Sequence, residues 1–222
     1  SLVSNSISMS KKYLVAGATG LMGTTLINQI PLNEDVTVIA RRKLNYKRPV
    51  EFLNLDEHIE LPHADHLFIC LGYPLELRDL LLMRESIKAK FKAVDYDLVI
   101  KIAEAAQQAN IKSVSVISSV EADPKSLNYY LKVKGQMENK IKELGFESVN
   151  IFRPSHLLGE REKEITLDVK IFEFFTNMTG NFLFGWFEKF KNVQAQKLAA
   201  TMYKKSNKMS NTIDIFTFKD FS

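Results

Sequence analysis

The chain has 222 residues, of which 45% are hydrophobic and 25% are charged, and its formal net charge is +4. This length suits one well-cored domain and is short for two. The mild basic excess is dispersed and no apolar run is long enough for a membrane span, so we expect neither a nucleic-acid nor a membrane partner.

The chain ends and the cysteine content set two further expectations. Residues 1–10 are polar and lack the apolar core of a signal peptide, so we expect a disordered tail or a cloning remnant there, with residues 11–222 forming one domain. Met9 is a candidate native start. A single cysteine, Cys70, cannot form an internal disulfide, which favours a reducing compartment, and we expect a cytoplasmic location.

The first elements are a strand over Tyr13–Gly17 and a helix over Leu21–Ile30, joined by a glycine-rich turn. Gly17, Gly20 and Gly23 are spaced G-x-x-G-x-x-G. In this strand–turn–helix context, glycines allow a sharp turn, a close approach of the backbone to a pyrophosphate, and tight packing of helix on strand. The free N–H groups at the helix start would face the anion. The pattern predicts a dinucleotide-binding turn.

The second strand, over Val36–Arg41, runs into the basic sequence Arg41-Arg42-Lys43. NAD-binding folds carry a carboxylate near this place that bonds the ribose 2′-hydroxyl. A guanidinium can instead bind a 2′-phosphate through paired N–H donors. The basic residues therefore favour NADP(H) as cofactor; the alternative interpretation is a solvated basic turn.

The remaining pattern alternates strand and helix. Strands are expected at 50–55, 66–72, 113–119, 148–153 and 212–218, and helices at 80–109 (with a break at 93–95), 126–144 and 193–205. Such alternation predicts an α/β fold, a Rossmann-like doubly wound parallel sheet with a small C-terminal extension on the substrate side. Ligands of such sheets bind beyond the carboxyl ends of the strands.

The fifth strand and the following helix carry a candidate catalytic constellation. Ser118 and Ser119 end the strand, and Tyr130 and Lys134 lie four residues apart, on one face of a helix. An ammonium stabilises a nearby phenolate, so Tyr130 could exchange a proton while Ser119 holds a carbonyl or alcohol oxygen. A structural interpretation also stands, because Tyr-x-x-x-Lys pairs are common on helices and strand-end serines often satisfy the backbone.

Together these motifs resemble a known family. Gly-Ala-Thr-Gly-Leu-Met-Gly, Ala-Arg-Arg-Lys-Leu, Cys-Leu-Gly, Ile-Ser-Ser-Val-Glu-Ala-Asp, Tyr-Leu-Lys-Val-Lys-Gly-Gln-Met-Glu and Phe-Arg-Pro-Ser resemble the atypical short-chain dehydrogenase/reductases. The resemblance is greatest to the Tat-interacting-protein group of oxidoreductase-like proteins and covers roughly residues 11–160.

The resemblance implies a Rossmann domain that binds NADP(H) and a Ser119–Tyr130–Lys134 catalytic triad. Arg41 and Arg42 would bind the 2′-phosphate, and Asn54 and Leu55 would contact adenine. The implied cofactor-binding residues are Gly17, Thr19, Gly20, Leu21, Met22, Gly23, Arg41, Arg42, Asn54, Leu55, Leu71, Gly72, Ser118, Tyr130, Lys134, Arg153 and Pro154. One departure is Asp95, which stands where many relatives have an asparagine that supports a proton relay; another is the tight spacing from Ser119 to Tyr130.

The first functional hypothesis is therefore an NADP(H)-dependent oxidoreductase that acts on a small carbonyl or alcohol substrate, with a homodimer as one arrangement. The second is an NADP(H)-binding regulator or sensor with little turnover, since fold alone does not imply catalysis. The third is a nucleotide-sugar epimerase or dehydratase, which the short C-terminal portion disfavours.

Other candidates are interpreted structurally. Cys70 lies in a buried-strand pattern and is read as an inert core residue, and His63 and His66 are read as surface histidines, without a metal site. His156 is a candidate pocket residue. The aromatic stretch at 171–190 is interpreted first as packing, then as a pocket wall or lid, and third as a dimer or membrane contact.

Overall fold

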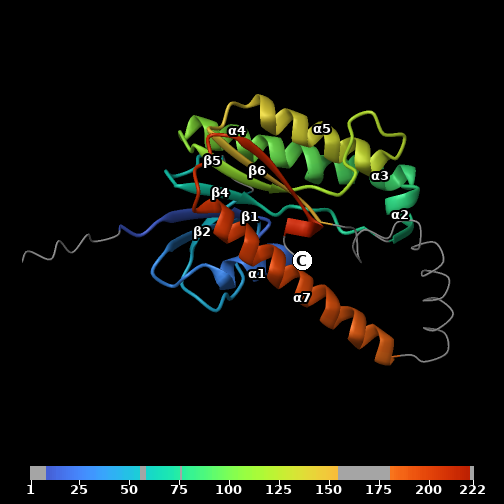
Figure 1. Ribbon diagram of the computed structural model, residues 1–222, viewed down its shortest axis with the longest axis horizontal. Helices are drawn as coiled ribbons and strands as arrows, with labels where there is room; N and C mark the ends of the chain where they lie inside the picture. Colours follow the sequence, from blue (N-terminus) through green and yellow to red (C-terminus); the bar gives the residue numbers. More distant parts are fainter. Residues whose placement is uncertain (1–8, 56–58, 76, 155–180, 221–222) are drawn as a thin grey trace, which may run out of the picture.

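The computed structural model describes residues 9–55, 59–75, 77–154 and 181–220, with the side chains of 77, 181–193 and 218 left out. Its centre is a seven-stranded sheet in the order β3-β2-β1-β4-β5-β6-β7, in which every neighbouring pair is parallel (Figure 1). The strands are β1 (Lys12–Ala16), β2 (Asp35–Ala40), β3 (Glu51–Asn54), β4 (His66–Ile69), β5 (Ser113–Ile117), β6 (Ser148–Arg153) and β7 (Ile213–Thr217).

Helices cover both faces of the sheet (Figure 1). One face carries α3, η1, α4 and α5, and the other carries α1 and α7. The helices are α1 (Leu21–Gln29), α2 (Leu77–Leu81), α3 (Glu85–Lys92), the π-helix η1 (Ala93–Leu98), α4 (Val99–Gln108), α5 (Tyr129–Glu143), α7 (Asn181–Ser206) and the 3-10 helix η2 (Phe218–Asp220). The predicted doubly wound parallel fold is confirmed.

Two apolar layers explain why the central strands are apolar on both sides. Leu14 and Leu67 pack toward α4 and α5, whereas Val15 and Phe68 pack toward α1 and α7. Successive residues of a strand point to opposite faces, so a strand buried on both faces needs an unbroken apolar run. This is the pattern that the sequence shows at β1 and β4.

The helices differ from the expected bounds in ways that local contacts explain. The expected helix over 80–109 is divided into α2, α3, η1 and α4, with the π-helix at the predicted break. The helix α5 starts at Tyr129, three residues later than expected, because the Asn128 side chain caps it by accepting the Leu131 N–H at 3.1 Å. The last helix, α7, starts twelve residues earlier than its expected start at 193.

Arg48 anchors the long loop between β2 and β3. Its guanidinium is buried and donates to the carbonyl oxygens of Ile30, Pro31 and Glu34, just beyond the end of α1. Carbonyl groups at a helix C-terminus lack intrahelical partners, and a cation there is favourable. The loop that carries Arg41 is therefore tied to the helix that follows the glycine-rich turn.

His66 is buried within the sheet, so the interpretation of this residue as a surface histidine is wrong. Its ring nitrogens lie 2.8 Å from the hydroxyl of Ser113 and 2.7 Å from that of Ser115, both on the adjacent strand β5. Burial, with a smaller contribution from the Lys11 ammonium, lowers the pKa of His66 from 6.5 to about 3. His63, in contrast, is exposed.

We expect His66 to make the fold acid-sensitive. Because the pKa of His66 is about 3 in the folded state and near 6.5 when unfolded, only the unfolded chain takes up this proton between those values. Stability should be complete above about pH 6.5 and fall by on the order of 1 kcal/mol per pH unit below it. Urea unfolding at pH 7, 6 and 5 measures this slope, which should flatten in His66→Gln; identical slopes in both proteins would contradict the prediction.

The described helices do not combine the length and apolar character that a bilayer crossing requires. The aromatic stretch at 171–190 and His156 fall outside the described residues or among those whose side chains are left out.

Candidate functional site

The candidate residues lie at the carboxyl edge of the sheet. The helix that follows β1 packs on one face, whereas the helices that follow β4 pack on the other (Figure 1). This change of face is the topological switch point, where parallel sheets bind ligands. Both the glycine-rich turn after β1 and the Leu71–Gly72 segment after β4 lie at this point.

The glycine-rich turn is held tightly against the end of β4. Gly17 has a φ of +79°, and a Cβ there would collide with the carbonyl group of Cys70. A Cβ at Gly23 would collide with the carbonyl oxygen of Gly17, where α1 packs on the turn. The sequence thus needs glycine at both positions, for conformation at the first and for close approach at both.

Hydrogen bonds to one carbonyl group fix the shape of this turn. The Tyr46 hydroxyl donates to the Ala18 oxygen at 3.0 Å, and the Thr24 hydroxyl donates to the same oxygen at 3.1 Å. No side chain caps the start of α1 at Gly20, and its first turn holds no acidic residue. Thr19, Gly20 and Leu21 are exposed, so the N–H groups at this helix start could hold a phosphate.

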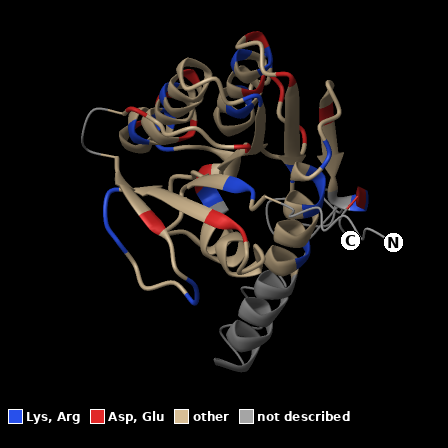
Figure 2. Cartoon of the chain, turned by 90° about the vertical axis from the view of Figure 1, so that its left-hand side faces the viewer, with Lys and Arg blue, Asp and Glu red and all other residues tan. Residues whose placement is uncertain are grey.

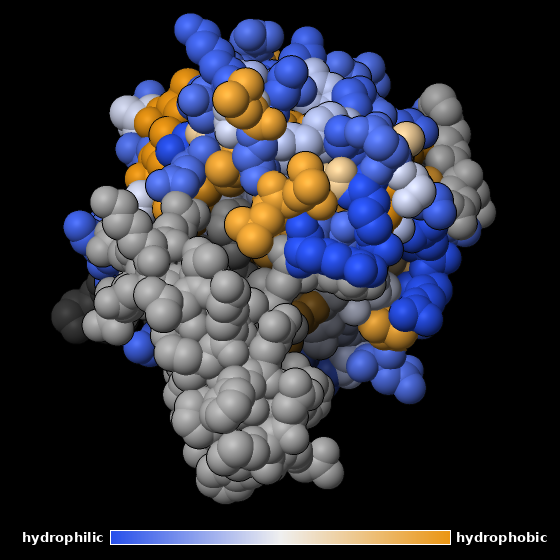
Figure 3. All heavy atoms as spheres, turned by 90° about the vertical axis from the view of Figure 1, so that its right-hand side faces the viewer, coloured by the Kyte–Doolittle hydropathy of each residue, from blue (hydrophilic) through white to orange (hydrophobic). Residues whose placement is uncertain are grey.

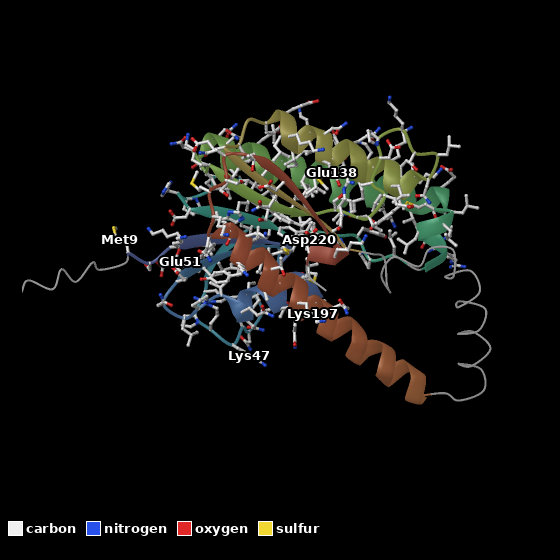
Figure 4. The ribbon with its side chains drawn as sticks, viewed as in Figure 1. Met9, Lys47, Glu51, Glu138, Lys197 and Asp220 are labelled. Atoms are coloured by element: carbon white, nitrogen blue, oxygen red, sulfur yellow. The ribbon has the colours of Figure 1, made fainter. Side chains whose placement is uncertain are left out.

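The basic residues after β2 are solvent-exposed. Arg41, Arg42 and Lys43 directly follow the carboxyl end of β2, in the loop that Tyr46 and Arg48 tie to α1 (Figure 2 colours lysines and arginines blue). Lys47 of the same loop is labelled in Figure 4. Guanidinium groups at this position could bind a phosphate bidentately. Asn54 and Leu55, at the end of β3, are half-buried beside this loop.

The two strand-end serines differ in their contacts. The Ser119 hydroxyl donates to the Val120 carbonyl oxygen at 3.2 Å. The Ser118 hydroxyl is buried without a hydrogen-bond partner among the described residues. Buried hydroxyl groups nearly always form a hydrogen bond in native proteins. The partner of the Ser118 hydroxyl is therefore expected to be a ligand or a residue outside the described ranges.

Tyr130 lies in the first turn of α5, within a small apolar cluster. Its ring packs on Phe91 with centroids 5.4 Å apart, and Met83 and Val133 belong to the same cluster. The ammonium of Lys134 lies 5.9 Å from the centre of the Tyr130 ring. The structure therefore brings together Tyr130 and Lys134, as their spacing predicts.

Lys134 is buried and forms an ion pair with Asp95 of η1, with 2.6 Å between Nζ and Oδ1. Burial alone would lower the pKa of Lys134, but the attraction of Asp95, followed by Tyr130 and Glu138, prevails and raises that pKa. The second oxygen of Asp95 accepts the backbone N–H of Tyr73 at 2.8 Å. Asp95 thus connects α5 with the segment after β4, a contact that the sequence did not reveal.

Arg153, one of the implied cofactor-binding residues, forms an ion pair with Glu138 of α5 (labelled in Figure 4). Its Nε and one Nη donate to the two carboxylate oxygens at 2.9 and 2.6 Å. Glu138 is almost completely buried, and its hydrogen bond is the main reason that the pKa of Arg153 is raised. This bidentate pair fixes the end of β6, including Pro154, against α5.

An exposed apolar surface borders the start of α5. Leu81, Leu82 and Leu127 are 77%, 83% and 104% exposed. Figure 3 shows hydrophobic side chains (orange) among hydrophilic ones on the face that lies at the right in Figure 1. The Asn128 amide donates to the carbonyl oxygens of Leu80 and Leu81, which holds the end of α2 beside α5. Exposed apolar residues therefore lie next to the start of α5.

Cysteine and metal chemistry have little support in the described part of the chain. Burial raises the pKa of the Cys70 thiol to about 12, as suits an inert residue rather than a nucleophile. In residues 9–55, 59–75, 77–154 and 181–220 no three His, Cys, Asp or Glu side chains gather as a metal site would require.

No family model matches the chain, but individual proteins do. It is 34% identical over 167 residues to protein HTATIP2 of Rattus norvegicus, a match that covers 69% of this chain and 66% of that protein. It is 30% identical over 173 residues to protein FMP52 of Lodderomyces elongisporus, with 70% of each chain covered. The chain spans less than two thirds of the first relative, and 39% of the FMP52 of Debaryomyces hansenii.

Solved structures with the same fold include nucleotide-dependent enzymes. A UDP-N-acetylglucosamine 4-epimerase from Methanobrevibacter ruminantium superimposes with a TM-score of 0.66 at 14% identity, covering 94% of this chain and 76% of that chain. A dTDP-4-dehydrorhamnose reductase from Bacillus anthracis, solved in complex with NADP, gives 0.57 at 15% identity, covering 94% and 74%. At such identities the likeness establishes the fold alone.

The expected cytoplasmic location is wrong. The FMP52 relatives from five fungi are named as mitochondrial proteins. A single cysteine indicates a reducing environment, and that observation cannot separate one such compartment from another.

Proposed function

This chain belongs to the atypical short-chain dehydrogenase/reductase family that includes HTATIP2 and FMP52, and from that premise we propose that it is an NADP(H)-dependent oxidoreductase. The substrate is a small carbonyl compound or the corresponding alcohol. The whole of residues 11–222 forms one nucleotide-binding domain in this proposal.

One observation carries the proposal: the carboxyl edge of one parallel sheet holds both the glycine-rich turn and the Tyr130–Lys134 pair. The turn at Gly17 lies at the switch point, and Tyr130 and Lys134 project from the helix after β5. Dinucleotides bind to doubly wound sheets across the crevice at this switch point.

The proposed roles follow from the chemistry of each side chain. A bound nicotinamide supplies or accepts the hydride. Tyr130 donates the proton to the carbonyl oxygen during reduction and accepts it during oxidation, and Lys134 stabilises its phenolate and binds the nicotinamide ribose. Ser119 holds the substrate oxygen. Ser118 lines the cofactor together with the segments 71–72 and 153–154.

Cofactor choice in this proposal depends on Arg41 and Arg42. We expect the parent protein to bind NADPH about tenfold or more tightly than NADH, since each charge-assisted contact to phosphate contributes about 1.5–3 kcal/mol. Arg41→Glu should abolish this preference because its carboxylate repels the 2′-phosphate. Fluorescence titration with both cofactors measures the ratio, with the Lys47→Glu variant of the same loop as a control for net charge.

Equal affinities of the parent protein for NADPH and NADH would contradict the assignment of the 2′-phosphate. If Arg41→Glu and Lys47→Glu both lose the preference for NADPH over NADH, the net charge of the loop determines that preference, rather than the Arg41 guanidinium.

A second function, an NADP(H)-binding regulator with little turnover, is favoured by the ion pair at Lys134. Asp95 compensates the ammonium charge that would stabilise the Tyr130 phenolate. NADPH oxidation measured across a panel of aldehydes and ketones separates the two functions. Tight binding without turnover of any member supports the regulator.

A further inference from the structure

Tyr46 joins the loop after β2 to the glycine-rich turn. Its hydroxyl donates to the Ala18 carbonyl oxygen at 3.0 Å, across 28 residues of sequence. Ala18 lies between Gly17 and Thr19 in the turn and is completely buried. The Tyr46 ring is half-buried and packs against the apolar layer between the sheet and α1. One side chain thus reaches from the basic loop to the backbone of the turn.

The Ala18 carbonyl oxygen accepts two hydroxyl groups, and one of them comes from the loop. The other is the hydroxyl of Thr24 in α1, which donates to the same oxygen at 3.1 Å. A carbonyl oxygen has two lone pairs, so these two bonds satisfy it. Thr24 belongs to the helix that follows the turn, whereas Tyr46 belongs to a separate segment. The two donors therefore connect different parts of the chain to one atom.

The loop is attached to the α1 side at two further places. The Lys47 backbone N–H lies 3.4 Å from the side-chain oxygen of Asn28, and the buried Arg48 guanidinium donates to three carbonyl oxygens just beyond α1. The exposed arginines at 41–42 lie at the other end of the loop. Of the three attachments, Tyr46 is the nearest to these arginines in sequence and the one that reaches the turn.

An attachment of this kind affects how tightly an exposed loop can bind a ligand. Arginine side chains are long and lose conformational freedom when they bind, and a loop that is already fixed adds less to that entropic cost. Burial raises the pKa of the Tyr46 hydroxyl, so the hydroxyl keeps its proton and remains a donor at neutral pH. The bond to Ala18 is therefore present under the conditions in which a cofactor binds.

We propose that Tyr46 is a positioning residue that determines cofactor specificity: its bond to Ala18 holds the loop so that Arg41 and Arg42 stay within reach of a 2′-phosphate beside the glycine-rich turn. The inference rests on the proposed function, since it assumes that NADP(H) binds at that turn. Tyr46 touches no cofactor atom in this scheme and acts through the loop. It should therefore affect the binding of NADPH, which carries the 2′-phosphate, and not that of NADH.

The test compares Tyr46→Phe with Thr24→Val. Each variant removes one hydroxyl donor from the Ala18 oxygen and nearly keeps the shape of the side chain, but Tyr46→Phe alone detaches the loop. Fluorescence titration measures the dissociation constants for NADPH and NADH. The rate of trypsin cleavage after residues 41–43, assigned by mass spectrometry and followed without cofactor, measures independently how firmly the loop is held.

We expect Tyr46→Phe to weaken NADPH binding about three- to tenfold, the usual effect of one neutral hydrogen bond, and to change NADH binding less than about twofold. Cleavage at 41–43 should accelerate by a similar factor. Thr24→Val should weaken the binding of both cofactors alike and leave the cleavage rate near that of the parent protein. In a variant that carries Arg41→Ala and Arg42→Ala, Tyr46→Phe should no longer alter the ratio of the two dissociation constants.

Asn28→Ala keeps the inference testable if Tyr46→Phe does not fold. Asn28 is exposed, and its replacement removes the contact with the Lys47 N–H, a second attachment of the same loop. Because this contact is long for a hydrogen bond, we expect a smaller change in the same direction, a loss of about twofold in the preference for NADPH over NADH.

A preference for NADPH over NADH that Tyr46→Phe leaves unchanged would overturn the inference, as would an equal loss of affinity for the two cofactors. If the parent protein shows no preference for NADPH, the proposed NADP(H) assignment fails, and the specificity role of Tyr46 fails with it. The cleavage rate separates the two cases. Faster cleavage in Tyr46→Phe would still show that Tyr46 holds the loop, and an unchanged rate would overturn that part as well.

Discussion

Replacing Gly17 by alanine is expected to destabilise the fold by about 3–5 kcal/mol. The residue has a φ of +79°, which costs a side chain about 1–2 kcal/mol, and the new Cβ would also collide with the Cys70 carbonyl group. That carbonyl belongs to the backbone at the end of β4 and cannot rotate away. To avoid this collision, β1 and β4 would have to separate at the switch point, so NADPH binding should be lost as well.

Gly145 provides a matched control for this prediction. Its φ is +80°, and a Cβ there would have no atom within 4 Å. Gly145→Ala should therefore cost only the conformational strain, about 1–2 kcal/mol. Urea unfolding of both variants measures the difference, and equal losses of stability would show that the close approach at Gly17 is not what requires glycine.

Replacing Tyr130 by phenylalanine is expected to reduce kcat for carbonyl reduction roughly 10²–10⁴-fold, the usual contribution of a positioned proton donor. The ring keeps its packing on Phe91, and the Lys134–Asp95 ion pair is retained, so folding and NADPH affinity should change little. Steady-state kinetics on whichever carbonyl compound the panel identifies measures the effect.

Tyr129→Phe is the control for this experiment, because Tyr129 is the neighbouring residue of α5 and also packs on Phe91. Its ring lies beneath the Lys88 ammonium at 5.2 Å, away from Lys134. Turnover that tolerates Tyr130→Phe, or that falls equally in both variants, would contradict the role of Tyr130 as proton donor.

These variants also distinguish the two functions that the site permits. An oxidoreductase should lose turnover on Tyr130→Phe and keep cofactor binding. A regulator should lose its function only with changes that disturb binding, such as those at Gly17 or Arg41.

The amino-acid sequence by itself determined the order of elements, the doubly wound sheet and the position of the glycine-rich turn. These depend on local information: apolar runs for strands that are buried on both faces, and glycines that the backbone requires. The spacing of Tyr130 and Lys134 also needed only the helical repeat, and their proximity in the structure follows from it.

Only the tertiary structure decided which polar side chains lie together. Asp95 with Lys134, Glu138 with Arg153, and His66 with its two serines join different helices and strands, and no periodicity encodes such pairs. His66 illustrates the reason: a polar residue becomes acceptable inside a sheet when a neighbouring strand supplies its hydrogen bonds. The order of the strands in the sheet decides which strand is that neighbour, and local sequence patterns do not reveal the order.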